Sequence, residues 1–208
     1  MFLNRRGSSF IELIVVVVVL SMTAVTVGMT VRNTNDNSSF ELQEVVASDL
    51  AREGVEGLKN IIATNWLKFS YNKEKCWLAN PLATECTSAI PVCPTDAPNC
   101  LFLDISSNDF YYYTPHLLPT QAYNWKLKNL GTTWTDIATG ITSAHGKAKL
   151  KIDNGFYNYD TGIETNFYRQ LKIKKINDST IQSVCTVSWK SRGRQFNVSA
   201  EAEIMNGQ

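Results

Sequence analysis

Histidine is scarce in this chain of 208 residues, which contains only His116 and His145. His116 lies beside a proline and His145 lies in a loop-like stretch, and neither adjoins a pair of acidic residues. The chain also lacks the Gly-x-Ser-x-Gly and His-Glu-x-x-His motifs and any glycine-rich phosphate loop. Because no catalytic constellation is present, we expect a protein that is not an enzyme and uses no cofactor. We expect both histidines to be surface or turn residues.

An excess of charge of one sign is missing too. The chain has 20 Lys and Arg against 19 Asp and Glu, for a formal net charge of +1. This balance gives no electrostatic reason to expect nucleic-acid binding. Charge is absent altogether from residues 13–31, a continuous and mostly apolar run. A run of this length is sufficient to cross a bilayer as a helix.

Glu12 lies just inside this apolar segment, and no Lys or Arg follows it until Arg32. A carboxylate at the centre of a membrane helix costs about 2.5–3.5 kcal/mol, and less near the end of the helix. We therefore expect Glu12 to find a partner outside its own helix. Small and hydroxyl residues that let membrane helices approach closely follow, namely Ser21, Thr23, Thr26, Gly28 and Thr30. They favour a helix that packs on copies or relatives of itself over a simple signal anchor.

Residues 7–13, with the sequence Gly-Ser-Ser-Phe-Ile-Glu-Leu, resemble the cleavage region of type IV prepilins and pseudopilins. The resemblance implies that residues 1–7 are a leader peptide and that a prepilin peptidase cuts between Gly7 and Ser8. It also implies methylation of the new N-terminus at Ser8, where the family commonly has Phe or Met. Glu12 is then the fifth mature residue, the family's conserved Glu, which would pair with the N-terminus at Ser8 of a neighbouring subunit.

The same resemblance implies a set of partners and a location. The partners are other pilins or pseudopilins, a platform protein, the assembly ATPase machinery and the membrane. Arg5 and Arg6 should stay in the cytoplasm by the positive-inside rule, which sends the C-terminus outside. We expect a single-pass protein of the cytoplasmic (inner) membrane that enters a cell-surface or periplasmic filament after assembly.

Three functions stay open at this point. The first is a structural subunit of a type IV pilus, and the cysteine-containing loop favours a minor subunit over the bulk one. The second is a minor pseudopilin of a type II secretion or DNA-uptake system. The third is a monomeric, signal-anchored extracytoplasmic binding domain that retains residues 1–31. The sequence does not separate a pilus from a secretion or competence pseudopilus.

The expected fold is α+β and pilin-like, with a long N-terminal helix packed on a C-terminal antiparallel sheet. Residues 8–32 form its transmembrane half, which becomes the filament core. Residues 33–68 form an amphipathic spine, because apolar residues recur there at steps of three and four. Residues 33–39 are weak helix formers that either interrupt the helix or mark where it leaves the membrane. Gly54 and Gly57 are expected to admit close packing from the domain.

Residues 101–208 are predicted to form the sheet domain. The expected strands cover residues 101–105, 110–114, 147–152, 167–173, 183–189 and 196–204. Asn154 and Gly155 are typical of a tight hairpin between the third of these and residues 156–157. Turns at residues 177–178 and 192–193 connect the last three strands into an antiparallel meander.

Residues 69–100 are predicted to be a loop containing four of the five cysteines, Cys76, Cys86, Cys93 and Cys100. Their spacing differs from that of a structural zinc site, so we favour disulfides, with the pairing left open. Cys185 lies in an alternating strand and is expected to be a buried free thiol, with a disulfide back to this loop as the second interpretation. Oxygen-bearing residues Asn158, Asp160 and Glu164 alternate as in calcium loops, but a plain hairpin turn is the preferred interpretation.

Overall fold

Helix α1 spans Arg6–Lys68, 63 residues, in the computed structural model, which describes residues 6–79, 111–118, 124–130 and 134–207. The chain divides into an N-terminal unit, Met1–Glu44, and a C-terminal unit, Val45–Gln208. The helix continues without a break through residues 33–39, so the interruption considered there does not occur. In that stretch the Thr34 hydroxyl donates to the Thr30 carbonyl at 2.9 Å, a local bond that satisfies a weak helix former within the helix.

The C-terminal part of α1 is the spine of the second unit. Its buried residues recur at steps of three and four along one face; they are Ala47, Leu50, Ala51, Val55, Leu58, Ile61 and Ile62. These side chains pack on the sheet, where Leu171, Ile181 and Cys185 belong to the same core cluster as Val55. Burial of this face is the main reason the helix is stable here. Val45, one of the apolar residues that recur at these steps in the sequence, is 59% exposed and lies outside the buried face.

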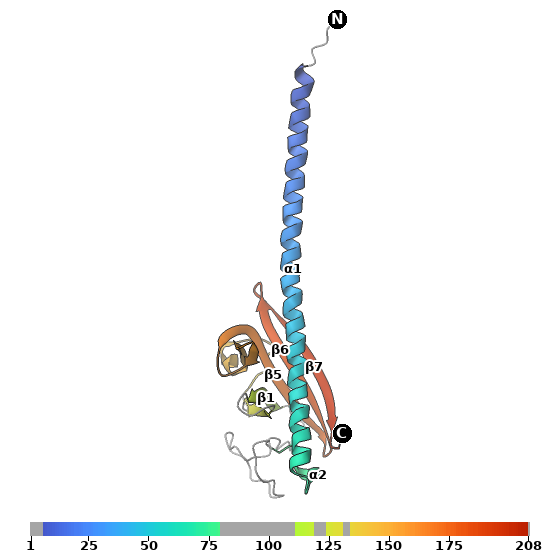
Figure 1. Ribbon diagram of the computed structural model, residues 1–208, viewed down its shortest axis with the longest axis vertical. Coiled ribbons are helices and arrows are strands. Elements are labelled where there is room, and N and C mark those ends of the chain that lie inside the picture. Colours follow the sequence, from blue (N-terminus) through green and yellow to red (C-terminus); the bar gives the residue numbers. More distant parts are fainter. Residues whose placement is uncertain (1–5, 80–110, 119–123, 131–133, 208) are drawn as a thin grey trace. The chain divides into compact units, whose positions relative to one another are not determined.

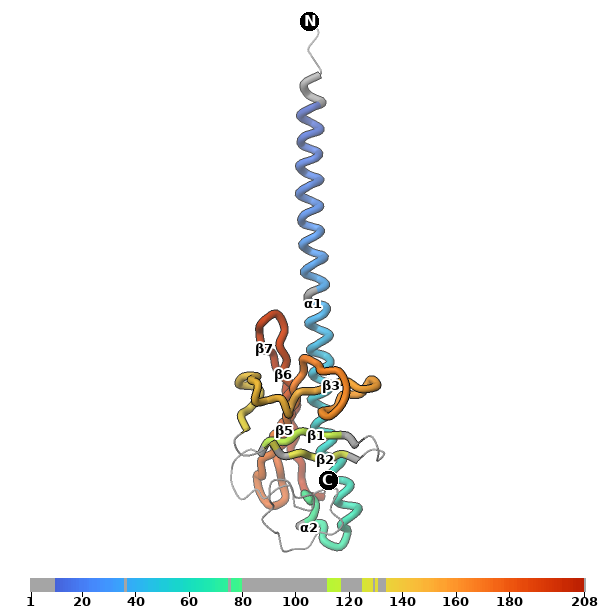
Figure 2. The backbone as a smooth tube through the Cα atoms, turned by 90° about the vertical axis from the view of Figure 1, so that its left-hand side faces the viewer, coloured from blue at the N-terminus to red at the C-terminus, as the bar shows by residue number. Residues whose placement is uncertain are grey.

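In the described part of the chain, seven antiparallel strands form one sheet. They are β1 (Tyr111–Leu118), β2 (Asn124–Asn129), β3 (Lys149–Asp153), β4 (Phe156–Asn158), β5 (Ile163–Asn177), β6 (Thr180–Ser191) and β7 (Arg194–Met205). The order is β2-β1-β5-β3-β4, and β6 pairs with the other edge of β5 and with β7. Figure 1 shows β5, β6 and β7 alongside the spine part of α1, and Figure 2 shows β1 and β2 side by side. The predicted α+β architecture of a long helix on an antiparallel sheet is confirmed.

The predicted turns at residues 154–155 and 192–193 are present, and both have left-handed backbone geometry. Asn154 and Gly155 join β3 to β4 with φ angles of 51° and 83°, which is the left-handed geometry of a type I′ hairpin. Arg192 and Gly193 join β6 to β7 with φ angles of 52° and 75°. Twelve consecutive residue pairs then connect β6 and β7. The predicted meander of the last three strands is therefore confirmed.

A second layer covers part of the sheet face opposite α1. It comprises residues 134–148, which end in the 3₁₀ helix η1 (Ser143–Ala148). Gln170 of β5 anchors this layer, because its Oε1 accepts from the Trp134 indole at 2.8 Å and from the Ile137 backbone at 3.1 Å. Ile137 itself is fully buried. The sequence did not predict this layer or strand β2.

The predicted loop 69–100 begins with more structure than expected. Residues Lys73–Cys76 form the short helix α2, so the prediction is wrong for these residues. Asn65 of α1 stabilises the corner, since its Nδ2 donates to the Trp77 carbonyl at 3.1 Å and to the Ala79 carbonyl at 2.6 Å. The predicted strand at residues 101–105 lies outside the described residues.

Candidate functional site

The N-terminal part of α1 presents the predicted processing and assembly residues. Gly7 and Ser8 lie in the first turn of the helix, and Glu12 is exposed one turn further on. The apolar residues from Phe10 to Val31 are exposed around the helix, for example Leu13 at 61%. Among the described residues one helix is long and apolar enough to cross a membrane, and none of its apolar segment is buried. An entirely exposed apolar surface of this kind is suited to lipid or to other apolar helices.

Glu12 forms no ion pair with any described residue, so the charge argument from the sequence is unchanged in the folded chain. The hydroxyl residues beyond it have local partners. The side chains of Ser21, Thr23, Thr26 and Thr30 donate to backbone carbonyls three or four residues earlier, at 2.8–3.1 Å. These bonds satisfy the hydroxyls inside an apolar environment. Glu12 is therefore a charged group at the start of the apolar segment that has no ion-pair partner among the described residues.

A buried arginine joins the spine helix to the sheet in the C-terminal unit. Arg169 of β5 is 1% exposed, and its Nη1 donates to Glu53 Oε2 of α1 at 2.9 Å. Its Nη2 donates to the Pro115 carbonyl of β1 at 3.1 Å, and its Nε donates to the Tyr159 hydroxyl at 2.8 Å. A planar guanidinium with five donors can satisfy several acceptors at once. Arg169 thus fixes α1, β1 and the segment after β4 to one point.

His116 of β1 extends this cluster. Its ring is 6% exposed and lies on the Tyr159 ring, with 4.4 Å between centroids. Its Nε2 is 3.0 Å from the Thr114 hydroxyl and its Nδ1 is 3.6 Å from Asp160 Oδ2. Burial lowers the pKa of His116 to about 4, with Asp160 opposing the shift and nearby lysines and Arg169 adding to it. The imidazole is therefore neutral at neutral pH and acts as a packed, hydrogen-bonded ring.

His145 is buried as well, at 1% exposure in η1. Its Nδ1 accepts from the Thr142 backbone at 3.0 Å, and its Nε2 lies 3.0 Å from the Thr135 hydroxyl. The expectation of a surface or turn position is wrong for His116, which is buried within strand β1, whereas His145 lies in the turns of η1 but is buried there. Their immediate sequence neighbours do not show that tertiary packing covers them.

Two of the cysteine predictions concern described residues. Cys185 is a buried free thiol, as predicted, and burial raises its pKa to about 12, which leaves it unreactive at neutral pH. Cys76 is fully buried and disulfide-bonded. The other disulfide candidates, Cys86, Cys93 and Cys100, lie outside the described residues, so the pairing stays a prediction.

The three residues of the calcium alternative each have a different neighbour. Asn158 Oδ1 accepts from the backbone of Asp160 and Thr161, as in an Asx turn. Asp160 faces His116, and Glu164 pairs with Lys149 at 2.5 Å. The described part of the chain holds no group of three or more His, Cys, Asp or Glu that could bind a metal ion. The segment contains a local Asx turn, but the interpretation as a plain hairpin turn is wrong, because β3 lies between β4 and β5 in the sheet.

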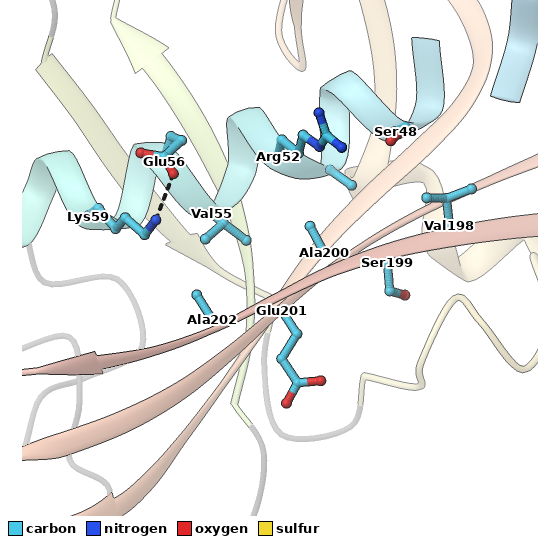
Figure 3. Close-up of a pocket in the computed structure, with 11 residues that line it drawn as sticks. Ser48, Arg52, Val55, Glu56, Lys59, Val198, Ser199, Ala200, Glu201 and Ala202 are labelled. Carbon is cyan, nitrogen blue, oxygen red and sulfur yellow. Dashed lines mark hydrogen bonds and ion pairs between the residues drawn. The ribbon is translucent and has the colours of Figure 1, made fainter. Parts of the chain in front are cut away.

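A groove of about 320 Å³ runs between α1 and β7 within the C-terminal unit. Its helix side includes Ser48, Arg52 and Val55, and its strand side is formed by residues 198–202. In Figure 3, Val55 and Ala200 point toward each other across it, while Ser199 and Glu201 point away from the helix. This groove was not predicted from the sequence, because it depends on which strand lies at the sheet edge beside α1.

No protein-family model, curated protein or solved structure matches this chain. Its function has to be inferred from its own residues.

Proposed function

We propose that this protein is a structural subunit, and a minor one, of a type IV pilus or a related pseudopilus filament. It is processed after Gly7 by a prepilin peptidase and assembles through its N-terminal helix. The observation that carries the proposal is Glu12, an exposed carboxylate one turn inside an exposed apolar helix. The prepilin-like residues 7–13 around it and the α+β architecture behind it support the same conclusion.

The proposed mechanism has two steps. Removal of residues 1–7 creates a positively charged amine at Ser8, and insertion keeps the membrane helix in the mature chain. Subunits then leave the membrane as their apolar helices pack together, and Glu12 of one subunit pairs with the Ser8 amine of the next. A buried carboxylate without a partner is strongly disfavoured, so this pairing determines where the next subunit binds. The contact is heterologous and does not close, which yields a filament.

The substitution Glu12→Ala tests this pairing. We expect it to abolish or misdirect incorporation into filaments while leaving membrane insertion intact, because the apolar segment is unchanged. Filament incorporation is measured by immunoblotting sheared filaments, and insertion by fractionating membranes. Glu41→Ala, an exposed carboxylate of the same helix outside the apolar run, is the matched control and should incorporate normally. Normal incorporation of Glu12→Ala would show that the pairing is wrong.

A further inference from the structure

Strand β7 presents a long open edge. Among the described residues it pairs only with β6, over twelve residue pairs without a register shift. Natural edge strands are usually blunted by Pro, Lys, a bulge or short length. The β7 sequence, RQFNVSAEAEIM, contains no Pro and no Lys. Its outer backbone groups are therefore a ready template for another extended chain.

The groove beside this edge has room for side chains of such a chain. The small side chains of Val55, Ala200 and Ala202 line part of it and leave space between the helix and the strand. Polar groups of α1 line the rest, namely Ser48, Arg52 and the Glu56–Lys59 ion pair. Residues that alternate along an added strand point alternately to the two faces of the sheet. Every second side chain of an added strand would thus enter the groove, where small apolar side chains fit.

Acidic side chains of β7 determine which side chains an added strand can carry on its other face. Glu201 and Glu203 are exposed, and alternation places both on the face turned away from α1. Neither carboxylate forms an ion pair with a described residue, although Glu201 accepts a hydrogen bond from Gln182. Opposite charges on adjacent strands stabilise the pair, and like charges destabilise it. Antiparallel pairing of β7 with β7 of a second copy in a register centred near Ala202 is disfavoured, because it would place Glu201 of one chain opposite Glu203 of the other.

We propose that the open edge of β7 binds an extended segment of a partner protein by strand addition. Small apolar side chains of that segment enter the groove facing α1, and they alternate with basic side chains that face Glu201 and Glu203. This inference goes beyond the proposed function, because the β7 edge lies in the C-terminal unit and requires neither cleavage at Ser8 nor Glu12.

The test uses the full chain in dodecyl maltoside micelles and the fluorescent peptide acetyl-Thr-Lys-Val-Lys-Val-Thr-amide. Fluorescence anisotropy should show saturable binding that weakens with added salt. A scrambled peptide of the same composition and a peptide N-methylated at alternate residues, which loses strand hydrogen bonds, should bind at least tenfold more weakly.

Two protein variants distinguish the contribution of the groove to peptide affinity from that of the charges. The double substitution Glu201→Lys with Glu203→Lys should weaken binding about five- to tenfold and should create a preference for the peptide with Asp in place of Lys. Ala202→Leu, which fills the groove, should weaken binding of both peptides. Glu41→Lys with Glu44→Lys makes the same change of charge outside the C-terminal unit and should leave the affinity unchanged. Circular dichroism confirms that each variant is folded.

Three results would overturn the proposal. If the scrambled and N-methylated peptides bound as tightly as the original peptide, no strand would be added. An unchanged affinity in the Ala202→Leu and Glu201→Lys with Glu203→Lys variants would place the peptide elsewhere. Concentration-dependent protection of β7 amides from hydrogen exchange without peptide would show that a second copy occupies the edge.

Discussion

At the scale of single residues, the C-terminal unit depends on a charged group placed where charge is costly. Arg169 is 1% exposed and has four different acceptors, from α1, β1 and the segment after β4. A buried arginine is tolerable only when its donors are satisfied, since removing one partner of a buried pair typically costs about 3–5 kcal/mol. The cluster therefore requires that helix and sheet meet in one geometry. His116 lies at the edge of this cluster and makes it sensitive to pH.

Acidification should destabilise the fold through His116. Its folded-state pKa of about 4 lies below the unfolded value of 6.5, because burial disfavours the imidazolium. Between these values the unfolded chain binds a proton that the folded chain does not. The contribution of His116 to stability is thus present above pH 6.5 and is lost as the pH falls toward 4, by about 1.4 kcal/mol per pH unit. Chemical denaturation of the full chain in micelles at pH 7 and pH 5 measures this loss.

The variant His116→Gln supplies the comparison for the pH experiment. Glutamine can keep a hydrogen bond to Thr114 but does not titrate, so the free energy of unfolding should fall less between pH 7 and pH 5 than in the wild type. An equal fall in both proteins would assign the pH dependence to other groups. The position also shows a limit of sequence reasoning. His116 was expected to be a surface or turn residue, because nothing beside it in the chain indicates Tyr159, which covers it from 43 residues further on.

At the scale of elements, two glycines set the distance between α1 and the sheet. A Cβ at Gly54 would lie 2.3 Å from Cys185 Sγ, and one at Gly57 would lie 2.7 Å from the Trp125 ring. Both glycines were predicted from the sequence to admit close packing, and the contacts confirm it. Glycine lowers helix propensity by about 1 kcal/mol relative to alanine. Glycine at these two positions therefore lowers helix stability but leaves room for the side chains of the sheet.

Replacing these glycines by alanine tests whether close packing or helix propensity has the larger effect on stability. We expect Gly54→Ala and Gly57→Ala each to lower the free energy of unfolding by about 1–3 kcal/mol, because the overpacking outweighs the gain in helix propensity. Thermal and chemical unfolding followed by circular dichroism measures the change. Gly28→Ala is the control, since a Cβ there meets no atom within 4 Å. It should not destabilise the C-terminal unit, and a stabilising effect of Gly54→Ala would contradict the close-packing account.

The elements that the sequence predicted well are those specified locally. The α1 spine follows from apolar periodicity, and the β5–β6–β7 meander and the β3–β4 hairpin follow from alternation and left-handed turn residues. Strand β2 was missed because the preceding strand was predicted to end at residue 114, whereas β1 continues to Leu118 and β2 pairs back along this extension. The Arg169 cluster was missed because its members come from four separate segments, and no single residue type in the sequence indicates such a contact.

At the scale of the whole molecule, the two units have opposite surfaces. The N-terminal unit exposes apolar side chains along α1, such as Val16 and Leu20. The described part of the C-terminal unit buries an apolar core between the spine and the sheet, although single apolar side chains such as Leu67 and Ile163 stay exposed. A chain of this kind is suited to two environments, an apolar one for the N-terminal helix and water for the sheet. Such a division is what the proposed filament subunit requires, with helices inside and sheets outside.

The N-terminus of the native protein tests the central claim most directly. Mass spectrometry of the intact chain purified from membranes or filaments gives the first residue without ambiguity. Cleavage by a prepilin peptidase predicts a chain that begins at Ser8, and an added methyl group on its amine would report the second processing step. An intact Met1, or a chain that begins beyond Val31, would contradict the account, because Glu12 would then have no neighbouring Ser8 amine with which to pair.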